Sequence, residues 1–356
     1  MACFIGADLS RLQKGDRAQE EVEEDFHGRK LHRRPWEFKA QPRSSPFARE
    51  KAFLFVNAGA ARYVSSMFSL TMLGSGSAGN AALLMTEHCR LLIDGGLSAR
   101  QLITRLALCG VMPEQLDGVL LTHEHGDHVC GLEVLCRKYH LPIYCNSLTA
   151  EAIRCGPLST HRNWRLFRTG AEFSICDITV QTFPVPHDAV EPVGYAFHAG
   201  RCGLGFITDL GYPTKMLVER LRQVHTLVIE TNHDEKLLQA CPVRPWPVKQ
   251  RIMSRHGHLS NAAAATVIEQ LLPGKIERVV LGHLSRDCNT PDLAKGAVQI
   301  LLARSRRTEV EIFCADQREI SNRFRIGETQ AGSFQPTFDH IFFQTTPGPL
   351  AATRAA

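Results

Sequence analysis

The sequence THEHGDH at residues 122–128 decides the fold, and it directly follows the apolar stretch DGVLL. With 16 histidines in 356 residues, the spacing His-x-His-x-Asp-His is expected by chance in roughly two of a thousand such chains. His123 and His125 are two residues apart and leave a strand end on the same side, whereas Asp127 and His128 fall in the turn and can face the opposite way. Imidazole and carboxylate groups bind Zn²⁺ and also accept Mn²⁺ or Fe²⁺. The loop therefore predicts a site for two divalent metal ions.

Three polar residues further along the chain stand where other apolar stretches end. His187 follows FPVP, Asp209 follows GLGFIT, and His283 follows VVLG. Taken singly, each is more often an ordinary polar residue leaving a strand. Because open α/β folds place their ligands at strand ends, we expect the three to join the histidine loop.

The composition is that of an ordinary globular chain, with 44% hydrophobic and 22% charged residues. No apolar run approaches the ~20 residues that span a bilayer, so we expect no membrane association. The twelve cysteines include no Cys-x-x-Cys pair and most lie in apolar runs, which predicts a reducing, cytoplasmic location. A net charge of +5 is too small for a globally basic nucleic-acid binder, so a phosphate-bearing substrate would need a local site.

The chain divides into three parts by composition. Residues 1–66 mix charge clusters with prolines and show no sustained period, which predicts a disordered N-terminal extension. Residues 67–327 carry the regular patterns of a folded hydrolase domain. Residues 328–356 are rich in Gln, Thr, Pro, Gly and Ala, which predicts a loose C-terminal tail.

Apolar periodicity within 67–327 predicts strands and helices in repeating order. Strands are expected at 68–73, 81–86, 89–93, 117–122, 172–185, 192–198, 203–208, 225–230, 277–282 and 309–314. Helices are expected at 98–109, 129–139, 147–155, 213–222, 260–272 and 291–304. This order predicts an α/β fold in which two sheets lie between helices.

Several of these segments resemble the five ordered motifs of the metallo-β-lactamase superfamily. They are IDGG at 93–96, the THEHGDH loop, His187, ITD at 207–209 and GH at 282–283. The resemblance covers about residues 67–327. It implies a four-layer αββα sandwich with the metals at one edge of the two sheets.

The resemblance also implies a ligand set for two metal ions. The ligands are His123, His125 and His187 for the first metal and Asp127, His128 and His283 for the second. Asp209 would bridge the two metals, and Asp94 would orient the histidine loop from behind. Asp127 is expected to act in catalysis as well as in metal binding. A water or hydroxide between the two cations would have a pKa lowered toward neutrality and would be the nucleophile.

Three longer segments are similar to the WalJ/YycJ branch of bacterial exonucleases. They are LVIETNHDEKLL at 227–238, GHLSNAAAATVIEQL at 257–271 and LGHLSRDCNTPDLA at 281–294, and the stretches GSGSAGNA and PHDAVEPVGYAF accompany them. This similarity implies a metal-dependent phosphodiester hydrolase that acts on nucleic acid, with DNA favoured over RNA. It further implies 5′-to-3′ exonuclease action, a direction that rests on the resemblance alone.

His258 and Glu230 are the candidates for proton transfer. His258 directly precedes a predicted helix N-terminus, so the imidazole and the helix can face a phosphate together. Glu230 ends a strand and can pair with His258, raise its pKa and make it a general acid for the leaving oxygen. The alternative is that His258 is a capping or core histidine.

Further substrate contacts are expected around these two residues. The candidates are Asn232, His233, Ser260, Asn261, Ser285 and Asn289. Lys249, Arg251 and Arg255 can contact a nucleic-acid backbone, although a solvated helix face explains them equally well. The chain departs from the family pattern at 240–252, which is proline-broken and contains Trp246, and at Arg286, where an acidic residue is expected.

Other functions stay open at this point. A small-molecule cyclic phosphodiesterase would use the same metals in a closed pocket without a basic groove. A non-catalytic metal-bound binding scaffold would keep the fold, although a site that has lost its activity usually loses ligands too. A secreted β-lactamase is disfavoured because no convincing secretory signal is found. The native metal and the oligomeric state are not predicted.

Overall fold

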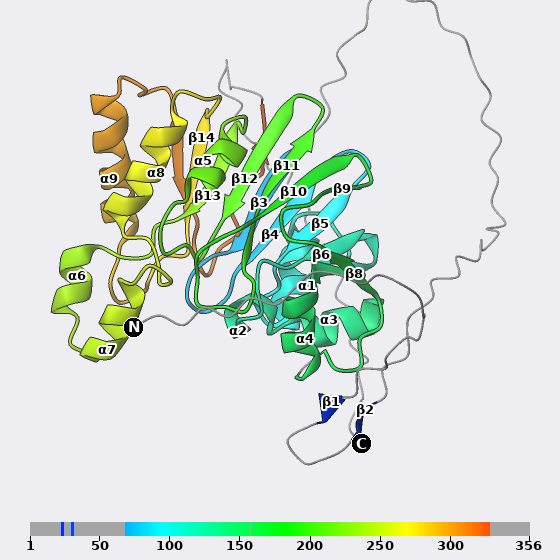
Figure 1. Cartoon of the computed structure of the whole chain (residues 1–356). Coiled ribbons are helices and arrows are strands. Elements are labelled where there is room, and N and C mark those ends of the chain that lie inside the picture. Colours follow the sequence, from blue (N-terminus) through cyan, green and yellow to red (C-terminus); the bar gives the residue numbers. More distant parts are fainter. Residues whose placement is uncertain (1–22, 25–29, 32–67, 157, 328–356) are drawn as a thin grey trace, which may run out of the picture. The chain divides into compact units, whose positions relative to one another are not determined.

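The computed structural model describes residues 23–24, 30–31, 68–156 and 158–327 (Figure 1). The chain divides into two units, Met1–Arg62 and Tyr63–Ala356. In the first unit, β1 (Glu23–Glu24) pairs antiparallel with β2 (Lys30–Leu31). The rest of the predicted N-terminal extension and the predicted C-terminal tail lie outside the described residues. The division at residues 66 and 327 therefore stays a prediction.

The second unit contains two seven-stranded mixed sheets. The first has the order β16-β3-β4-β5-β6-β7-β8, in which β3, β4 and β5 are antiparallel and β5 to β8 are parallel. Its strands are β3 (Ser69–Gly74), β4 (Ala81–Met85), β5 (Arg90–Ile93), β6 (Gly118–Leu120), β7 (Ile143–Asn146), β8 (Trp164–Phe167) and β16 (Phe324–Arg325).

The second sheet has the order β15-β14-β13-β12-β11-β10-β9. Strands β12 to β15 are parallel and β9 to β12 are antiparallel. Its strands are β9 (Glu172–Ile175), β10 (Ile178–Pro184), β11 (Val193–Ala199), β12 (Cys202–Ile207), β13 (Thr226–Glu230), β14 (Arg278–Gly282) and β15 (Glu311–Cys314).

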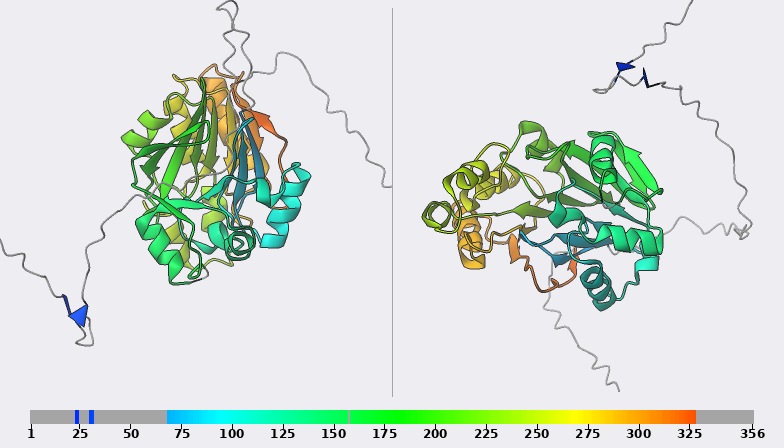
Figure 2. Two further views of the ribbon diagram at one scale, coloured as in Figure 1. Left: turned by 90° about the vertical axis from the view of Figure 1, so that its right-hand side faces the viewer. Right: turned by 90° about the horizontal axis from the view of Figure 1, so that it is seen from below.

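Helices cover the outer face of each sheet (Figure 2). Those next to the first sheet are α1 (Ala99–Leu108), the 3₁₀ turn η1 (Pro113–Gln115), α2 (Gly126–Val129), α3 (Leu132–Tyr139) and α4 (Ser147–Arg154). The later helices of the chain are α5 (Lys215–Leu221), α6 (Glu235–Ala240), α7 (Trp246–Ile252), α8 (Asn261–Leu271) and α9 (Pro291–Arg304), of which α5, α8 and α9 pack on the second sheet. None of the helices in this described part of the chain is long and apolar enough to cross a membrane.

Three apolar layers hold the second unit together. In β5, Leu91 and Ile93 pack between the two sheets, where they join Tyr195 and Phe197 of β11. Leu92 points the other way and packs under α1, α3 and α4 because successive side chains of a strand face opposite sides. A third cluster joins the second sheet to α5, α8 and α9. These layers confirm the predicted four-layer αββα sandwich.

Some elements differ from the sequence predictions. The strand expected at 172–185 is a hairpin, with β9 and β10 on either side of a tight turn at Cys176. The segment 240–252, expected to be broken by proline, contains the helix α7, because Pro247 lies in its first turn, where a missing backbone N–H breaks no helical hydrogen bond. The short elements β7, β8, α6 and β16 were not predicted, since they have only two to six residues, which is too few to show a clear period.

Candidate metal centre

Strand ends deliver the site residues. The loop 122–128 follows β6, His187 follows β10, Asp209 follows β12 and His283 follows β14. Asp209 and His283 have positive φ angles of 53° and 54°. Such a backbone is unusual outside glycine, and it persists where the surrounding structure fixes it, commonly at functional sites. The structure thus brings the predicted strand ends of both sheets to one edge of the sandwich.

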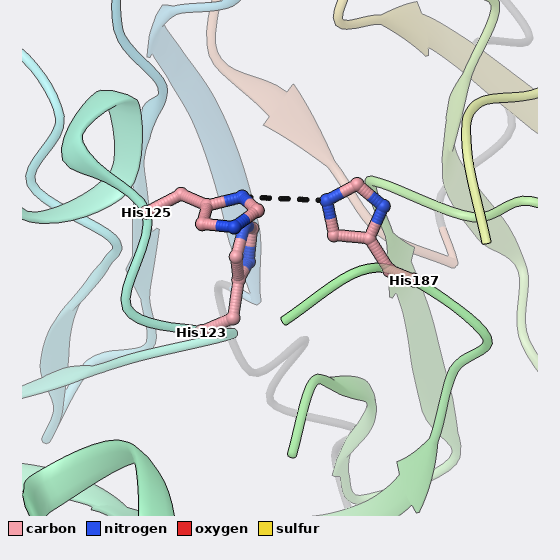
Figure 3. Close-up of side chains that lie close together, drawn as sticks. All are labelled: His123, His125 and His187. Atoms are coloured by element: carbon pink, nitrogen blue, oxygen red, sulfur yellow. Dashed lines mark hydrogen bonds between the residues drawn. The ribbon is translucent and has the colours of Figure 1, made fainter. Parts of the chain in front are cut away.

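Three histidines form the first group of possible ligands (Figure 3). The ligand nitrogens of His123, His125 and His187 all lie within 4.8 Å of one another. His187 Nε2 is 3.4 Å from His125 Nδ1, across the gap between the histidine loop and the end of β10. This is the trio expected to hold one metal ion.

A second group contains Asp127, His128 and His283. His283 Nε2 lies 3.3 Å and His128 Nε2 lies 3.5 Å from Asp127 Oδ2. The Asp209 carboxylate lies between the two groups: Oδ2 is 3.1 Å from His128 Nε2, and Oδ1 is 3.7 Å from His187 Nε2. Asp209 therefore lies where the resemblance predicts a ligand shared by the two groups.

The side chains of these groups fit divalent cations. His123 Nε2 is buried and has no hydrogen-bond partner among the described residues, and a buried polar atom is normally paired. Imidazole nitrogens and carboxylate oxygens converge from several directions, as the ligands of a transition metal do. Divalent metal ions would satisfy the buried nitrogen and the two neighbouring aspartates together.

The charges of the site favour metal binding. Burial raises the pKa of the Asp209 carboxyl, but His283 and His128 outweigh it and hold that pKa well below its usual value. Burial of Asp127 is likewise outweighed by hydrogen bonds from His128 and His283, so its pKa is lowered as well. Burial, followed by repulsion from His128, lowers the pKa of His123 well below its usual value. Two charged carboxylates and a neutral His123 ring are forms that bind metal. At His128 and His283 burial is outweighed by the attraction of Asp209, which raises both pKa values, so these two rings would release protons as a metal binds.

Asp94 orients the histidine loop. Its Oδ2 is 2.8 Å from His128 Nδ1, and its Oδ1 accepts a hydrogen bond from the backbone N–H of Thr122 (2.9 Å). A ring that donates from Nδ1 to a carboxylate keeps Nε2 free for a metal. His187 is held in a similar way, with Nδ1 at 3.0 Å from the Gly257 carbonyl.

Two residues of the site were missed by the sequence analysis. Asn80 Nδ2 lies 3.3 Å from Asp127 Oδ2 and 3.2 Å from His128 Nε2. Ser75 Oγ accepts a hydrogen bond from the backbone N–H of His283 (2.8 Å). Both belong to the Gly/Ser turn GSGSAGNA after β3, and this turn is the one signal that could have indicated them.

Glu230 and His258 lie next to the metal ligands. His258 Nδ1 is 3.2 Å from Glu230 Oε1 and 3.7 Å from Asp209 Oδ1. Glu230 is fully buried and also accepts hydrogen bonds from the backbone N–H groups of Leu259 (2.6 Å) and Leu210 (3.0 Å). Burial lowers the pKa of His258, but Glu230 and then Asp209 outweigh it and raise this pKa to about 9.

A pocket of about 210 Å³ opens over these residues. Its far wall is α7 and the loop before it, which contribute Arg244, Val248, Arg251 and Ile252. Arg251 forms an ion pair with Asp188, the residue after His187. The pocket thus has candidate metal ligands at its base and two arginines on its wall.

The predicted substrate contacts fall into two sets. Asn232 and Ser285 line the pocket. The remaining four do not line it and form hydrogen bonds between loops, although Asn289 also lines an adjoining hollow that shares Arg244 and Ser285 with this pocket. Asn261 and Asn289 exchange side-chain amide hydrogen bonds of 2.9 and 2.8 Å. Ser260 caps α8, and its backbone pairs with that of His233 in an isolated bridge.

The basic residues considered for backbone contact also differ from one another. Lys249 is buried and donates a hydrogen bond to the Gln239 carbonyl (2.7 Å), so it is not available to a substrate. Arg255 lies over the ring of Tyr212, 4.2 Å from its centroid. Arg251 is the one of the three that lines the pocket.

Comparisons with known proteins agree with this geometry. A family model described as "Beta-lactamase superfamily domain" matches residues 89–284. The chain is 36% identical to the exodeoxyribonuclease YycJ of Bacillus anthracis, over 65% of this chain and 88% of that protein. It is also 36% identical to the exodeoxyribonuclease WalJ of Streptococcus pneumoniae, over 64% and 85%. The crystal structure of the metallo-β-lactamase fold protein YhfI from Bacillus subtilis superposes with a TM-score of 0.55 at 17% identity, over 71% and 98%. The chain therefore belongs to the metallo-β-lactamase superfamily and, within it, groups with YycJ and WalJ.

Proposed function

We propose that this protein is a metal-dependent exonuclease that removes nucleotides from DNA in the 5′-to-3′ direction. The observation that carries the proposal is the Glu230–His258 pair beside the seven candidate metal ligands, of which His125, Asp127, His187, Asp209 and His283 line one pocket with His258. The names of the relatives YycJ and WalJ, both exodeoxyribonucleases, support the same activity. DNA as the substrate and the direction of digestion are the finer parts of the proposal.

The metal ions we propose are two Zn²⁺ ions. One would be held by His123, His125 and His187, the other by Asp127, His128 and His283, with Asp209 shared. Zinc accepts nitrogen and oxygen donors in this mixture, and Mn²⁺ or Fe²⁺ are the alternatives. When bound, two such cations supply Lewis-acid stabilisation of the charge that develops during phosphodiester hydrolysis, and they make water more acidic.

His258 is the proposed general acid. Its Nδ1 faces Glu230 at 3.2 Å, so Nε2 is the nitrogen that can donate a proton to the leaving oxygen. The raised pKa keeps the ring protonated at neutral pH, which is the form that an acid needs. Glu230 does not touch the substrate in this scheme; it positions His258 and stabilises its charge.

The pocket wall provides the proposed contacts to the strand. Arg244 and Arg251 can pair with phosphate oxygens, and Asn232 and Ser285 can donate hydrogen bonds to them. Trp246, at the start of α7, is 59% exposed. Trp246 does not line the pocket itself but stands two residues after Arg244 in the chain, and an exposed aromatic ring is a surface on which bases can stack without sequence preference.

The proposed location is the cytoplasm. None of the cysteines in the described residues is in a disulfide bond. Thiols in this state fit a reducing compartment.

The test is a substrate panel for metal-loaded protein with and without His258→Ala. Duplex DNA with a 5′ phosphate should be shortened stepwise from that end, and the variant should retain its metal while losing roughly 10²- to 10⁴-fold in rate. Turnover of a cyclic nucleotide without DNA cleavage would instead identify a small-molecule phosphodiesterase. Inactivity on both by fully metal-loaded protein would identify a non-catalytic scaffold.

A further inference from the structure

A second group of metal-binding side chains lies away from the catalytic residues. Cys89, Asp117 and Cys176 each offer a ligand atom, and these three atoms lie within 4.8 Å of one another. No residue of this group has a place in the reaction proposed above. Two sulfurs and a carboxylate are a donor set that zinc accepts.

The group stands at the opposite ends of strands that also serve the metal centre. Cys89 directly precedes β5, and Asp94 follows that strand. Asp117 directly precedes β6, and the 122–128 loop follows it. Cys176 comes two residues before β10, the strand that leads to His187. The same strands therefore connect the two sites, and they separate them by their full length.

The group also joins the two sheets. Cys89 lies in the turn between β4 and β5 of the first sheet, and Cys176 lies in the turn between β9 and β10 of the second. The Cys89 thiol donates to the Ile175 carbonyl at 3.6 Å, and Thr86 Oγ1 donates to Asp177 Oδ1 at 2.6 Å. The two turns are thus already in contact at the place where the ligand atoms meet.

The remaining ligand is fixed by its own sheet. Asp117 Oδ2 accepts a hydrogen bond from the backbone N–H of Arg90 (2.8 Å), and the Asp117 N–H donates to the Arg90 carbonyl (2.8 Å). The carboxylate is therefore held against the turn that carries Cys89. Ligands that are positioned before a metal arrives lose little conformational entropy on binding it.

The backbone at Cys176 also marks the group. Cys176 has a φ angle of 53°, in the region that favours glycine. A divalent cation would stabilise the two thiolates and the carboxylate together.

We propose that Cys89, Cys176 and Asp117 bind a structural Zn²⁺ ion that is distinct from the catalytic metals and clamps the two sheets together. Both thiols lose their protons to solvent as the metal–sulfur bonds form, and no oxidation takes place. Water or the neighbouring Asp177 completes four ligands. The ion would stabilise the end of the sandwich opposite the pocket.

The test uses cobalt as a spectroscopic substitute for zinc in the full chain. None of the proposed catalytic ligands contains sulfur, so a sulfur-to-cobalt charge-transfer band in the near ultraviolet reports a thiolate site, and the Cys176→Ser variant assigns the band to this group rather than to the neighbouring thiols Cys241 and Cys288. We expect the band in the wild-type protein and in Cys130→Ser, the matched control, whose exposed thiol lies three residues after Asp127. We expect its loss, together with one bound metal equivalent, in Cys176→Ser and a shifted or weakened band in Asp117→Asn.

Three results would overturn the proposal. They are the absence of the band from wild-type protein with saturated catalytic ligands, its persistence in Cys176→Ser, and a Cys89–Cys176 disulfide in protein purified with a reductant. Circular dichroism shows whether each variant is folded. Where a variant is not folded, the presence or absence of the band in the wild-type protein still tests the proposal. Because the readout is independent of nuclease activity, it also separates this proposal from the one above.

Discussion

Replacing Glu230 with glutamine tests the proton-transfer pair most sharply. The substitution keeps the shape of the side chain and removes the charge that faces His258 Nδ1 at 3.2 Å. A pKa of about 9 in place of the ordinary 6.5 corresponds to roughly 3 kcal/mol in favour of the protonated ring. The proton is present below the raised pKa and is lost as the pH rises through it.

The expected loss of activity depends on pH. At pH 8, His258 with a pKa near 9 is about 90% protonated, whereas a ring returned fully to about 6.5 is about 3% protonated, so the rate should fall by up to about 30-fold, and by less to the extent that Asp209 and Asp188 keep the pKa raised. At pH 6 both rings are mostly protonated, and the two proteins should differ by less than about twofold. Bound cations lower the pKa of His258 in both proteins. The pH at which the two rates diverge therefore moves lower, while the difference between the two pKa values remains.

The assay is the initial rate of DNA digestion between about pH 6 and pH 9, with the metal content of each protein measured in parallel. His258→Ala is the control. Its pH–rate profile should lack the fall at high pH that the loss of the His258 proton causes in the wild-type protein. Equal defects of Glu230→Gln at every pH, with metal content unchanged, would refute this reasoning. A separate, pH-independent loss of stability of about 1–3 kcal/mol is expected, because the amide NH₂ of glutamine cannot accept the backbone hydrogen bond that a carboxylate oxygen now receives.

Three further predictions follow from other contacts. Asp94→Asn should weaken metal binding by about 10- to 100-fold, because the amide no longer fixes the His128 tautomer; competition with a chromophoric chelator measures this, and unchanged affinity would contradict it. Arg105→Leu should lower the free energy of unfolding by about 2–4 kcal/mol, because the guanidinium donates hydrogen bonds to three backbone carbonyls near the two ends of the domain. Denaturant unfolding measures this loss, and a loss below about 0.5 kcal/mol would contradict the prediction. Arg244→Ala and Arg251→Ala should each flatten the slope of log Kd for DNA against log salt by about 1; an unchanged slope would remove these arginines from the phosphate path.

The parts of the site that could be predicted from the sequence are those in which the chemistry is local. The 122–128 loop places four candidate ligands, three histidines and one aspartate, within seven residues, so its spacing alone indicates metal binding. His187, Asp209 and His283 could be predicted because each ends an apolar strand, whereas Asp94 came from the family resemblance. The layered fold was predicted from the repeated order of strands and helices, and strands that are apolar on both faces, such as β5, agree with it.

The rest depends on tertiary contacts that no local pattern contains. Asn80 reaches Asp127 across 47 residues, and Ser75 reaches His283 across 208. Asn261 and Asn289 have the residue type of substrate contacts, but they satisfy each other behind the pocket. Likewise, the sequence does not indicate that Lys249 is buried, because its neighbours on α7 are exposed or half-buried.

The most direct test of the central claim is restoration of DNA digestion by metal. Protein stripped with a chelator should be inactive on 5′-phosphorylated duplex DNA and should recover stepwise 5′ digestion as metal is returned to it. His125→Ala, which removes one imidazole from the first group of ligands, should not recover. Digestion that persists in stripped protein, or that His125→Ala restores fully, would contradict a metal-dependent exonuclease built on this centre.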